Sequence, residues 1–427
     1  MTASRGRALR QALALCGGLA LCSLPRSLAA EPRGFRVPGE PALPEWVQSA
    51  EVTRIDEPIY QGPSGAEARR GAAARGARLP VFGSQRGPGC ATRFLLVGAL
   101  AWLCQDGAQL SPAAPDADGE GGFSKSHGGL PYRYHFVGPD GSFGYRAVQT
   151  AEDGVPDAQL LKGFGVAVVR VEKNPEGNPF GLTTEDLWVP MRDLRPVVAI
   201  AFHGRELSGT LAVAWVTSTT AFASRAPDKA KDPKLKVSRF QTLDVLEQRV
   251  LGGHRWFRYA DDAWLSDRDA RAPTPAQLPS ELRPGERWID VEVATQVLTA
   301  YVGDRPVFAT LVSTGRGNEG SVLATPRGSH RLWVKLRGSD MDNLDDESAA
   351  ENYAIQAVPW VMYFERGYGL HGTFWHSQFG SKHSHGCVNL TPLDAERLFG
   401  WTSPRLPPGW TAALPTSYEP GTLIRVR

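Results

Sequence analysis

The stretch HGTFWHSQFGSKHSHGCVN, residues 371–389, holds four of the chain's nine histidines and one cysteine, Cys387. Nucleophilic acyl chemistry needs this pair of residue types, because a thiolate attacks a carbonyl carbon and an imidazole keeps the sulfur ionised. A dense cluster of both types therefore makes this stretch the best candidate for a reactive site in the chain.

Three interpretations of this stretch follow from its residue types. In the first, Cys387 is a nucleophile, one histidine is its base, and the tight turn at residues 384–387 presents backbone N–H groups to a developing oxyanion. Gly386 suits that turn, because a backbone without a side chain can come close to the reacting carbonyl. In the second, the four histidines and Cys387 bind zinc, although the stretch has neither a Cys-x-x-Cys pair nor a His-Glu-x-x-His helix. In the third, the stretch only packs a turn, which leaves four histidines without a role.

Length and charge indicate a secreted protein of several domains. The 427 residues suggest about three domains. Residues 1–30 carry arginines without an acid, then an apolar run and a tail of small residues, which is the layout of a secretory signal. The apolar run is about half the length that a membrane span requires. Without residues 1–30 the formal charge falls from +2 to −2, because four arginines are removed, so charge favours no nucleic-acid partner.

Three cysteines remain after residue 30. Cys90 and Cys104 lie fourteen positions apart, and Cys387 is distant from both. In an oxidising exterior the first two can close a small loop, which leaves Cys387 as the odd thiol. An unpaired thiol in an exported protein invites a chemical explanation; the alternative is that Cys387 is simply a small buried apolar residue.

Three segments upstream share an ending. Trp102, Trp188 and Trp264 each precede an aliphatic residue, a polar turn and then a proline, and they lie 86 and 76 residues apart. This recurrence predicts one small β unit used three times, because proline is tolerated only at strand ends and edges. Such units loosely resemble the bacterial SH3-like modules that precede cell-wall enzymes. We expect the tryptophans to anchor the cores of these units; the alternative is that they stack on a sugar or peptide face.

The C-terminal third has the pattern of short antiparallel strands followed by one helix. Residues 289–293 alternate between apolar and charged side chains, and further strands are predicted at residues 296–301, 307–312, 331–336 and 423–426. Thr391, Pro392 and Asp394 form a good helix start, and Gly400 is expected to end the helix. The acidic segment 339–351 is predicted to be a surface loop, because it lacks the ligand spacing of a calcium loop.

Residues 371–389 resemble the signature of the L,D-transpeptidase catalytic domain (YkuD-like) of bacterial cell walls. That signature is His-Gly, roughly a dozen residues, then Ser/Thr-His-Gly-Cys, an aliphatic residue, and Asn or Arg. Here twelve residues separate His371, in His371-Gly372, from Ser384, which begins Ser384-His385-Gly386-Cys387-Val388-Asn389. The resemblance covers about 140 of the 427 residues and concerns only the C-terminal part of the chain.

The resemblance implies a role for each matching position. Cys387 would be the nucleophile, His371 its general base and later acid, and the carbonyl of Gly372 would orient the imidazole. The backbone N–H groups of His385, Gly386 and Cys387 would form the oxyanion hole. The remaining residues are expected to hold the turn or to line the substrate groove: Ser384 and Asn389 for the turn, and His376, His383, Trp375 and Tyr368 for the groove.

The implied reaction is acyl transfer between peptidoglycan stem peptides, without a metal or cofactor. Cys387 would attack the carbonyl of the third residue of a tetrapeptide stem, release the terminal D-alanine, and pass the acyl group to the side-chain amine of a neighbouring stem, which forms a 3-3 cross-link. Family members that use water or another amine, or that release wall-anchored lipoproteins, share the motif. A same-fold carboxypeptidase or amidase therefore stays open, as does a wall-binding scaffold with an inactive catalytic domain.

We therefore expect a mostly β protein acting at the periphery of the cell wall, in the periplasm or cell envelope, with a role in wall biogenesis and cell shape. Its last domain is predicted to be β-sandwich-like, with a short helix after Cys387. The expected order along the chain is a signal peptide at residues 1–30, an extended lead-in at 31–78, a partial SH3-like module at 79–115, a linker at 116–129, SH3-like modules at 130–200 and 201–284, and the catalytic domain at 285–427.

Overall fold

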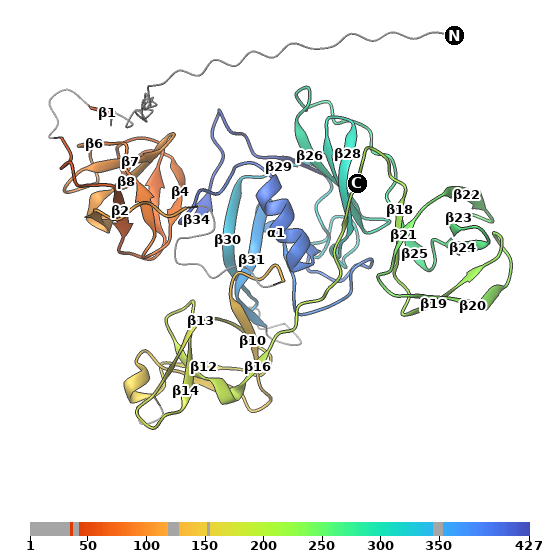
Figure 1. The fold of residues 1–427 in the computed structure, drawn as a ribbon, viewed down its shortest axis with the longest axis horizontal. Coiled ribbons are helices and arrows are strands. Elements are labelled where there is room, and N and C mark those ends of the chain that lie inside the picture. The colour runs from red at the N-terminus through yellow and green to blue at the C-terminus, as the bar shows by residue number, and fades with distance from the viewer. Residues whose placement is uncertain (1–34, 37–41, 118–127, 152–153, 345–352) are drawn as a thin grey trace, which may run out of the picture.

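The computed structural model describes residues 35–36, 42–117, 128–151, 154–344 and 353–427. It is mostly β, as predicted, and its described part contains one α-helix, α1 (Pro392–Trp401). Figure 1 shows three small β modules arranged around a C-terminal domain, with the first and third modules at opposite ends. The predicted signal peptide and residues 118–127 of the predicted linker lie outside the described residues. Within the described ranges, no helix has the length and apolar character needed to cross a membrane.

One layer of the C-terminal domain is a six-stranded sheet. Its strands lie in the order β17-β28-β27-β26-β35-β29, in which β35 runs parallel to β26 and the other pairs are antiparallel. The bounds are β17 (Arg205–Glu206), β26 (Arg287–Glu292), β27 (Val297–Val302), β28 (Arg305–Leu311), β29 (Gly328–Arg331) and β35 (Leu423–Val426). The strands predicted near 289–293, 296–301, 307–312 and 423–426 are therefore confirmed.

The second layer carries the stretch with which the sequence analysis began. It contains β30 (Val334–Asp342), β31 (Ala354–Glu365), β32 (Tyr368–Gly372) and β33 (Val388–Leu390), with α1 packed against β31 and β32. Apolar side chains from both layers and the helix form one core, which includes Ile289, Val291, Leu298, Met362, Leu370, Val388, Leu398 and Ile424. This core fixes the two strands that flank the cysteine-histidine cluster.

Two local predictions in this domain need correction. The strand expected at 331–336 is divided, because β29 ends at Arg331 and β30 begins at Val334. The acidic segment expected to be a loop from residue 339 is still a strand up to Asp342, because its backbone pairs with β31 as far as Ala354. Residues 345–352 of that segment lie outside the described part of the chain.

The helix begins as predicted but ends one residue later. The Thr391 hydroxyl accepts the Asp394 N–H at 3.3 Å, and Pro392 is the first helical residue. The helix passes through Gly400 to Trp401. At its C-terminal end the ammonium group of the fully buried Lys335 donates to the carbonyls of Phe399 and Thr402, which would otherwise lack partners at a helix end.

The first module begins earlier in the chain than the sequence suggested. Residues expected to form an extended lead-in contain the strands β1 (Phe35–Arg36), β2 (Ser49–Val52), β3 (Glu57–Tyr60) and β4 (Arg69–Ala73), and β5 (Arg78–Pro80) begins at their last residue. The strands that follow are β6 (Gly83–Gln85), β7 (Phe94–Gly98), β8 (Ala101–Cys104) and β9 (Ala108–Ser111). Small side chains such as Ala50, Ala73 and Ala77 fill much of its core, and all three are fully buried. Alanine carries little hydrophobic signal, so the strand periodicity was weak in the sequence.

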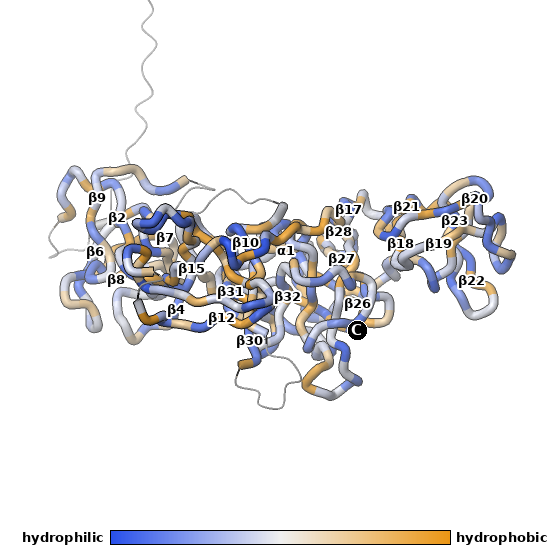
Figure 2. Tube along the Cα trace, turned by 90° about the horizontal axis from the view of Figure 1, so that it is seen from below, coloured by the Kyte–Doolittle hydropathy of each residue, from blue (hydrophilic) through white to orange (hydrophobic). Residues whose placement is uncertain are grey.

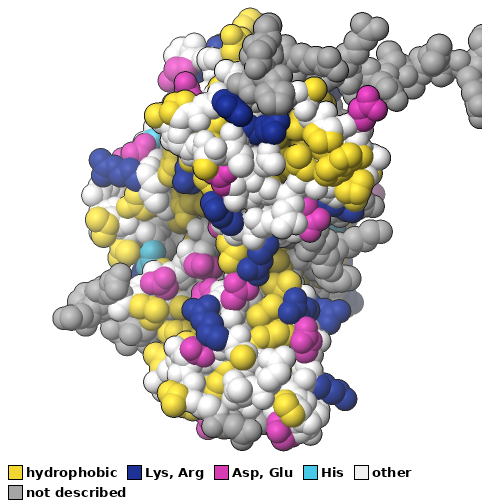
Figure 3. Space-filling model, turned by 90° about the vertical axis from the view of Figure 1, so that its left-hand side faces the viewer, with side chains coloured by type: hydrophobic (Ala, Val, Ile, Leu, Met, Phe, Trp, Pro, Cys, Tyr) yellow, Lys and Arg dark blue, Asp and Glu magenta, His cyan; other side chains and the backbone are white. Residues whose placement is uncertain are grey.

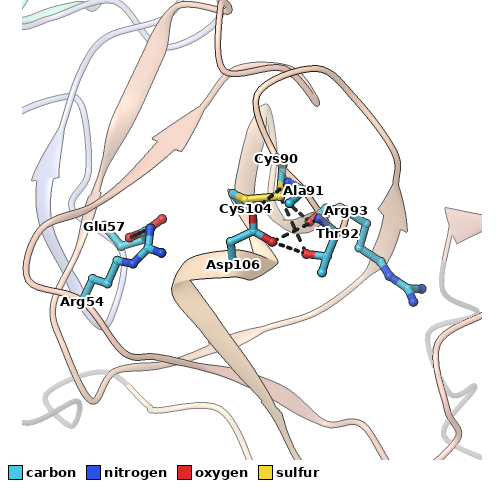
Figure 4. Close-up of a disulfide and its surroundings, with 8 residues drawn as sticks. All are labelled: Arg54, Glu57, Cys90, Ala91, Thr92, Arg93, Cys104 and Asp106. Atoms are coloured by element: carbon cyan, nitrogen blue, oxygen red, sulfur yellow. Dashed lines mark hydrogen bonds and ion pairs between the residues drawn. A yellow bond between two sulfur atoms is a disulfide. The ribbon is translucent and has the colours of Figure 1, made fainter.

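Cys90 and Cys104 form a disulfide within this module (Figure 4). The carboxylate of Asp106 accepts hydrogen bonds from the Ala91 and Thr92 N–H groups and from the Thr92 hydroxyl, so it organises the same loop. The loop inferred from cysteine spacing is confirmed, and Cys387 is the one free cysteine among the described residues.

The three recurring tryptophans are buried. Trp102 lies on β8, Trp188 on β15 (Trp188–Pro190) and Trp264 on β24 (Ala263–Ser266), with exposed fractions of 8%, 6% and 5%. Each is followed by a turn and then by a short strand: β9, β16 (Leu194–Pro196) or β25 (Ala270–Arg271). Burial at this level supports the interpretation that the tryptophans anchor module cores.

Each module contacts the C-terminal domain. Strand β34 (Trp410–Ala413) pairs with β30 on one side and with β4 of the first module on the other. The second module packs β10 (Arg133–Val137) and β13 (Gly165–Lys173) near β31, and β17, which leads into the third module, pairs with β28. Figure 2, from below, again places the first and third modules at opposite ends.

The boundary between the first and second modules is polar. Arg75 of the first module forms an ion pair with Asp186 of the second at 3.0 Å. Figure 3 shows basic and acidic side chains interspersed over this side of the molecule. The two modules are therefore joined by an ion pair between partly exposed side chains.

Burial lowers the pKa of Lys335 from 10.5 to about 7, which predicts a specific pH dependence of stability. Between pH 7 and 10.5 the unfolded chain binds more protons at this site than the folded chain, so the free energy of unfolding should rise with pH, by up to about 1.4 kcal/mol per unit. Denaturant unfolding at pH 7, 8 and 9 would measure the rise relative to Lys335→Met, which lacks the group. A constant difference between the two proteins over this range would contradict the prediction.

Candidate active site

Cys387 and His371 line a cleft of about 890 Å³ in the C-terminal domain. Its walls come from the β30–β31 hairpin, the start of β32, the loop between β32 and β33, and two residues of the second module, Phe136 and Gly163. Of the residues predicted to act at the site, the cleft is lined by Cys387, His371, His385, Ser384, Asn389, His376, Trp375 and Tyr368. His383 also lines it. Stretches that are separate in the sequence therefore meet around one cysteine.

Strand pairing brings the cysteine and its candidate base together. His371 lies on β32 and Cys387 immediately precedes β33, and the two strands run parallel with His371 opposite Asn389. Neighbouring strands lie about 4.8 Å apart, so Cys387, two positions before Asn389, is held beside Gly369, two positions before His371. The Nδ1 atom of His371 lies 3.2 Å from the carbonyl of Gly372. An Nδ1–H that donates to this carbonyl leaves Nε2 as the basic nitrogen.

The pair is uncharged at neutral pH. His371 is only 3% exposed, and burial lowers its pKa to about 4. Burial also raises the pKa of Cys387, although the backbone N–H of Gly369 partly opposes this by favouring the thiolate. The expectation that an imidazolium keeps the sulfur ionised therefore does not describe this resting state. Chemistry at Cys387 requires its proton to pass to His371 as the sulfur attacks.

The turn before the cysteine is held by Ser384. Its hydroxyl donates to the carbonyl of Cys387 at 2.5 Å and accepts the N–H of Gly386 at 3.1 Å. The Gly386 N–H is therefore engaged within the turn, contrary to its expected place in an oxyanion hole. The backbone N–H groups of His385 and Cys387 remain the candidates for that role.

Gly386 is required for a steric reason. Its φ is +128°, and a Cβ there would overlap the ring of Tyr368. Tyr368 is itself anchored, because its hydroxyl donates to the carbonyl of Val322 at 2.9 Å. Tyr368 therefore lines the cleft, as expected, and also packs against Gly386 in the turn before Cys387.

Trp375 covers the imidazole of His371. The two rings stack with centroids 5.7 Å apart and planes inclined by 19°. A large aromatic face on the histidine contributes to its burial and restricts the orientation of the ring. Trp375 therefore lines the cleft, as expected, and also packs directly on the candidate base.

His376 holds Asn389 rather than acting as a second base. Burial and the nearby His383 lower the pKa of His376 to about 3, so its ring is neutral. Its Nδ1 accepts the Gln378 N–H at 3.1 Å, so the ring proton is on Nε2, which lies 2.7 Å from the amide of Asn389. In the present orientation the side-chain oxygen of Asn389 is buried without a partner. If the Asn389 amide is turned by 180°, this oxygen accepts the hydrogen bond from the Nε2–H of His376.

Several cleft residues had no signal in the sequence. Tyr353 stacks on His385 with centroids 5.9 Å apart. Arg316, Asp340 and Asp342 bring charges of both signs to the cleft. None of these lies within the signature, and only alignment with other chains or the fold itself could have found them. In the described part of the chain, the one close group of three potential metal-binding side chains is Cys90, Cys104 and Asp106, and two of these are joined in the disulfide.

The raised pKa of the Cys387 thiol predicts how its reactivity depends on pH. Because the thiol form dominates at neutral pH, the rate of alkylation by iodoacetamide should rise about tenfold per pH unit from pH 6 towards 9. The modified Cys387 peptide would be quantified by mass spectrometry. A rate that is flat between pH 5 and 8 would instead reveal a preformed thiolate–imidazolium pair.

Replacing Gly386 with alanine should disrupt the turn. The strained φ and the overlap with Tyr368 predict a loss of about 1–3 kcal/mol in unfolding free energy and altered alkylation of Cys387. Gly400→Ala is the matched control, because a Cβ there meets nothing within 4 Å and alanine favours the helix by up to about 1 kcal/mol. Equal thermal unfolding of the two variants would show that the turn tolerates a side chain.

Comparison with known proteins gives one family match. Residues 286–426 match the family model described as L,D-transpeptidase catalytic domain (YkuD). A search of curated proteins found no match to the chain.

Several solved structures are similar over parts of their length. One is the catalytic domain of an Enterococcus faecium L,D-transpeptidase, with 22% identity over 34% of this chain and 98% of that chain and a TM-score of 0.25. Another is a crystal structure of a mutant E. faecium L,D-transpeptidase, with 20% identity over 33% of this chain and 50% of that chain and a TM-score of 0.25. Mycobacterium tuberculosis L,D-transpeptidase 3 with a faropenem-derived adduct is also similar, with 17% identity over 41% of this chain and 77% of that chain and a TM-score of 0.26. The chain spans half of the mutant E. faecium structure's length.

The position of the family match agrees with the fold. That match begins one residue before β26 and ends at the last residue of β35, so it contains every strand of the two layers except β17, together with residues 371–389. Residues 286–426 of this chain therefore match the L,D-transpeptidase catalytic domain family.

Proposed function

We propose that this protein is an exported cysteine acyltransferase that forms 3-3 cross-links between peptidoglycan stem peptides. The observation that carries the proposal is the meeting of Cys387 and His371 in one cleft, inside a domain that matches the L,D-transpeptidase catalytic family. A covalent cysteine intermediate divides one difficult amide exchange into two easier steps.

In the first step, the Cys387 sulfur attacks the carbonyl carbon of the third residue of a tetrapeptide stem, and the thiol proton moves to Nε2 of His371. The oxyanion receives hydrogen bonds from the backbone N–H groups of His385 and Cys387. When the C–N bond breaks, the amine of D-alanine takes the proton from His371 and leaves, and a thioester remains on Cys387. The neutral resting pair suits this order, because proton transfer accompanies attack.

In the second step, the side-chain amine of a neighbouring stem attacks the thioester. His371 removes a proton from the attacking nitrogen and returns it to the Cys387 sulfur as the C–S bond breaks. Charges of both signs in the cleft, from Arg316, Asp340 and Asp342, suit peptides that carry both carboxylates and amines. The upstream modules would orient the domain at the wall in the periplasm or cell envelope, where the product contributes to wall biogenesis and cell shape.

Replacement of either reacting residue should stop the reaction. Cys387→Ala is expected to lose the thioester and all release of D-alanine, and His371→Ala to lose about 10²–10⁴-fold in rate, because a general base contributes that much. Purified protein would be incubated with disaccharide-tetrapeptides and the products read by mass spectrometry. His254→Ala is a matched control, since His254 pairs with Asp267 in the third module.

The same assay separates the alternatives. Dimeric products that need an amine acceptor identify a transpeptidase, whereas tripeptide formed equally with and without acceptor identifies a hydrolase. Wild-type protein with neither a mass adduct on Cys387 nor loss of D-alanine would leave the wall-binding scaffold as the better account.

A further inference from the structure

The second module reaches into the cleft that contains Cys387. Phe136, on β10, and Gly163, in the turn before β13, line the same cleft as Cys387 and His371. Both lie more than 120 residues outside the stretch that matches the L,D-transpeptidase family. The cleft is therefore composite, with one wall from a module that the family match does not include.

The second module is held in a defined position. The hydroxyl of Tyr134, a residue only 3% exposed, donates to the carbonyl of Ala357 on β31. In the other direction, the indole N–H of Trp360 donates to the carbonyl of Gly129 at 2.5 Å. The backbone N–H of Ala167 also donates to the side-chain oxygen of Gln356 at 3.2 Å. Buried hydrogen bonds in both directions fix the module against β31, because breaking them would leave polar groups without partners.

The strand that receives these bonds is itself strained. Ala357 and Trp360 have φ values of +46° and +60°, which are uncommon for residues with side chains and persist only where the surrounding structure holds them. The module bonds directly to both residues. Ile355 and Tyr363, on either side of them along β31, line the cleft. Contacts with the second module thus support the backbone shape of the cleft wall.

A run of aromatic rings connects the module to the candidate base. Phe374 lies with its ring centroid 4.4 Å from that of Tyr134 and 6.0 Å from that of Phe136. Phe374 meets Trp375 edge-on at 5.1 Å, and Trp375 stacks on His371. The module therefore packs on the residues that cover the imidazole as well as on the rim of the cleft.

We propose that the second module forms one wall of the substrate-binding cleft, with Phe136 as a residue that determines specificity. Its half-buried ring offers an apolar surface in the cleft that also holds Cys387, which suits the aliphatic parts of a stem peptide. The identity of this ligand rests on the proposed function. The wall itself does not, and it can be tested without any peptidoglycan substrate.

The test compares two thiol reagents of different size on the full-length protein. Alkylation of Cys387 by pyrenyl maleimide, which is bulky, and by iodoacetamide, which is small, would be followed by mass spectrometry of the Cys387 peptide. The quantity compared is the rate with pyrenyl maleimide divided by the rate with iodoacetamide. Phe136→Ala removes the ring from the wall and should raise this ratio at least about threefold, whereas Phe136→Trp should lower it. Phe143→Ala is the matched control, because Phe143 lies on β11 (Ser142–Gly144) of the same module and is 46% exposed.

Opposite changes in the two Phe136 variants exclude a general loss of folding, which would raise both rates in both proteins. With disaccharide-tetrapeptide as substrate, Phe136→Ala should also raise KM about tenfold with a smaller change in kcat. An unchanged rate ratio in both variants would contradict the proposal that Phe136 forms a wall of the cleft, even if the protein is active on stem peptides. A changed ratio in a protein that does not turn over stem peptides supports the wall and rejects the proposed function instead.

Discussion

The parallel pairing of β32 with β33 is the constraint on which the site depends. It sets His371 opposite Asn389, and so fixes the end of the turn that carries Cys387. The surrounding contacts all act on these two short strands: Ser384 closes the turn, Tyr368 presses on Gly386, and His376 holds the amide of Asn389. Because both strands are buried on the common core, the cysteine and histidine are pre-positioned before any substrate arrives.

The environment of the pair also determines its protonation. Enclosure by Trp375 and the core removes water from His371, and an imidazolium without solvent or a carboxylate partner is unfavourable. A neutral thiol beside a neutral imidazole is the result. A neutral thiol reacts slowly with reagents that depend on a standing thiolate.

The sequence predicted the reactive pair and the local structure around it more fully than it predicted the walls of the cleft. Features that depend on neighbouring residues in the chain could be predicted. They are the signature from His371 to Asn389, the Thr391 helix cap and the strands of the C-terminal sheet. The low pKa of His371 could not be predicted from the sequence, because the burial of its ring depends on packing by distant segments. Phe136 was missed for the same reason, as no local pattern relates it to a cysteine some 250 residues later. The strands of the first module were missed because its core uses alanines such as Ala50 and Ala73, whose small side chains weaken the periodic signal.

Strand β34 has a consequence for the order in which the molecule is completed. It lies between β30 and β4, so the edge of a module made from residues 49–111 is covered by residues 410–413. During synthesis this edge stays open until residues 410–413 have emerged, and an open edge is a template for pairing with other chains. The first module therefore acquires its last strand only when the catalytic domain folds. The sheet of the N-terminal module is thus complete only after residues 410–413 have paired with it.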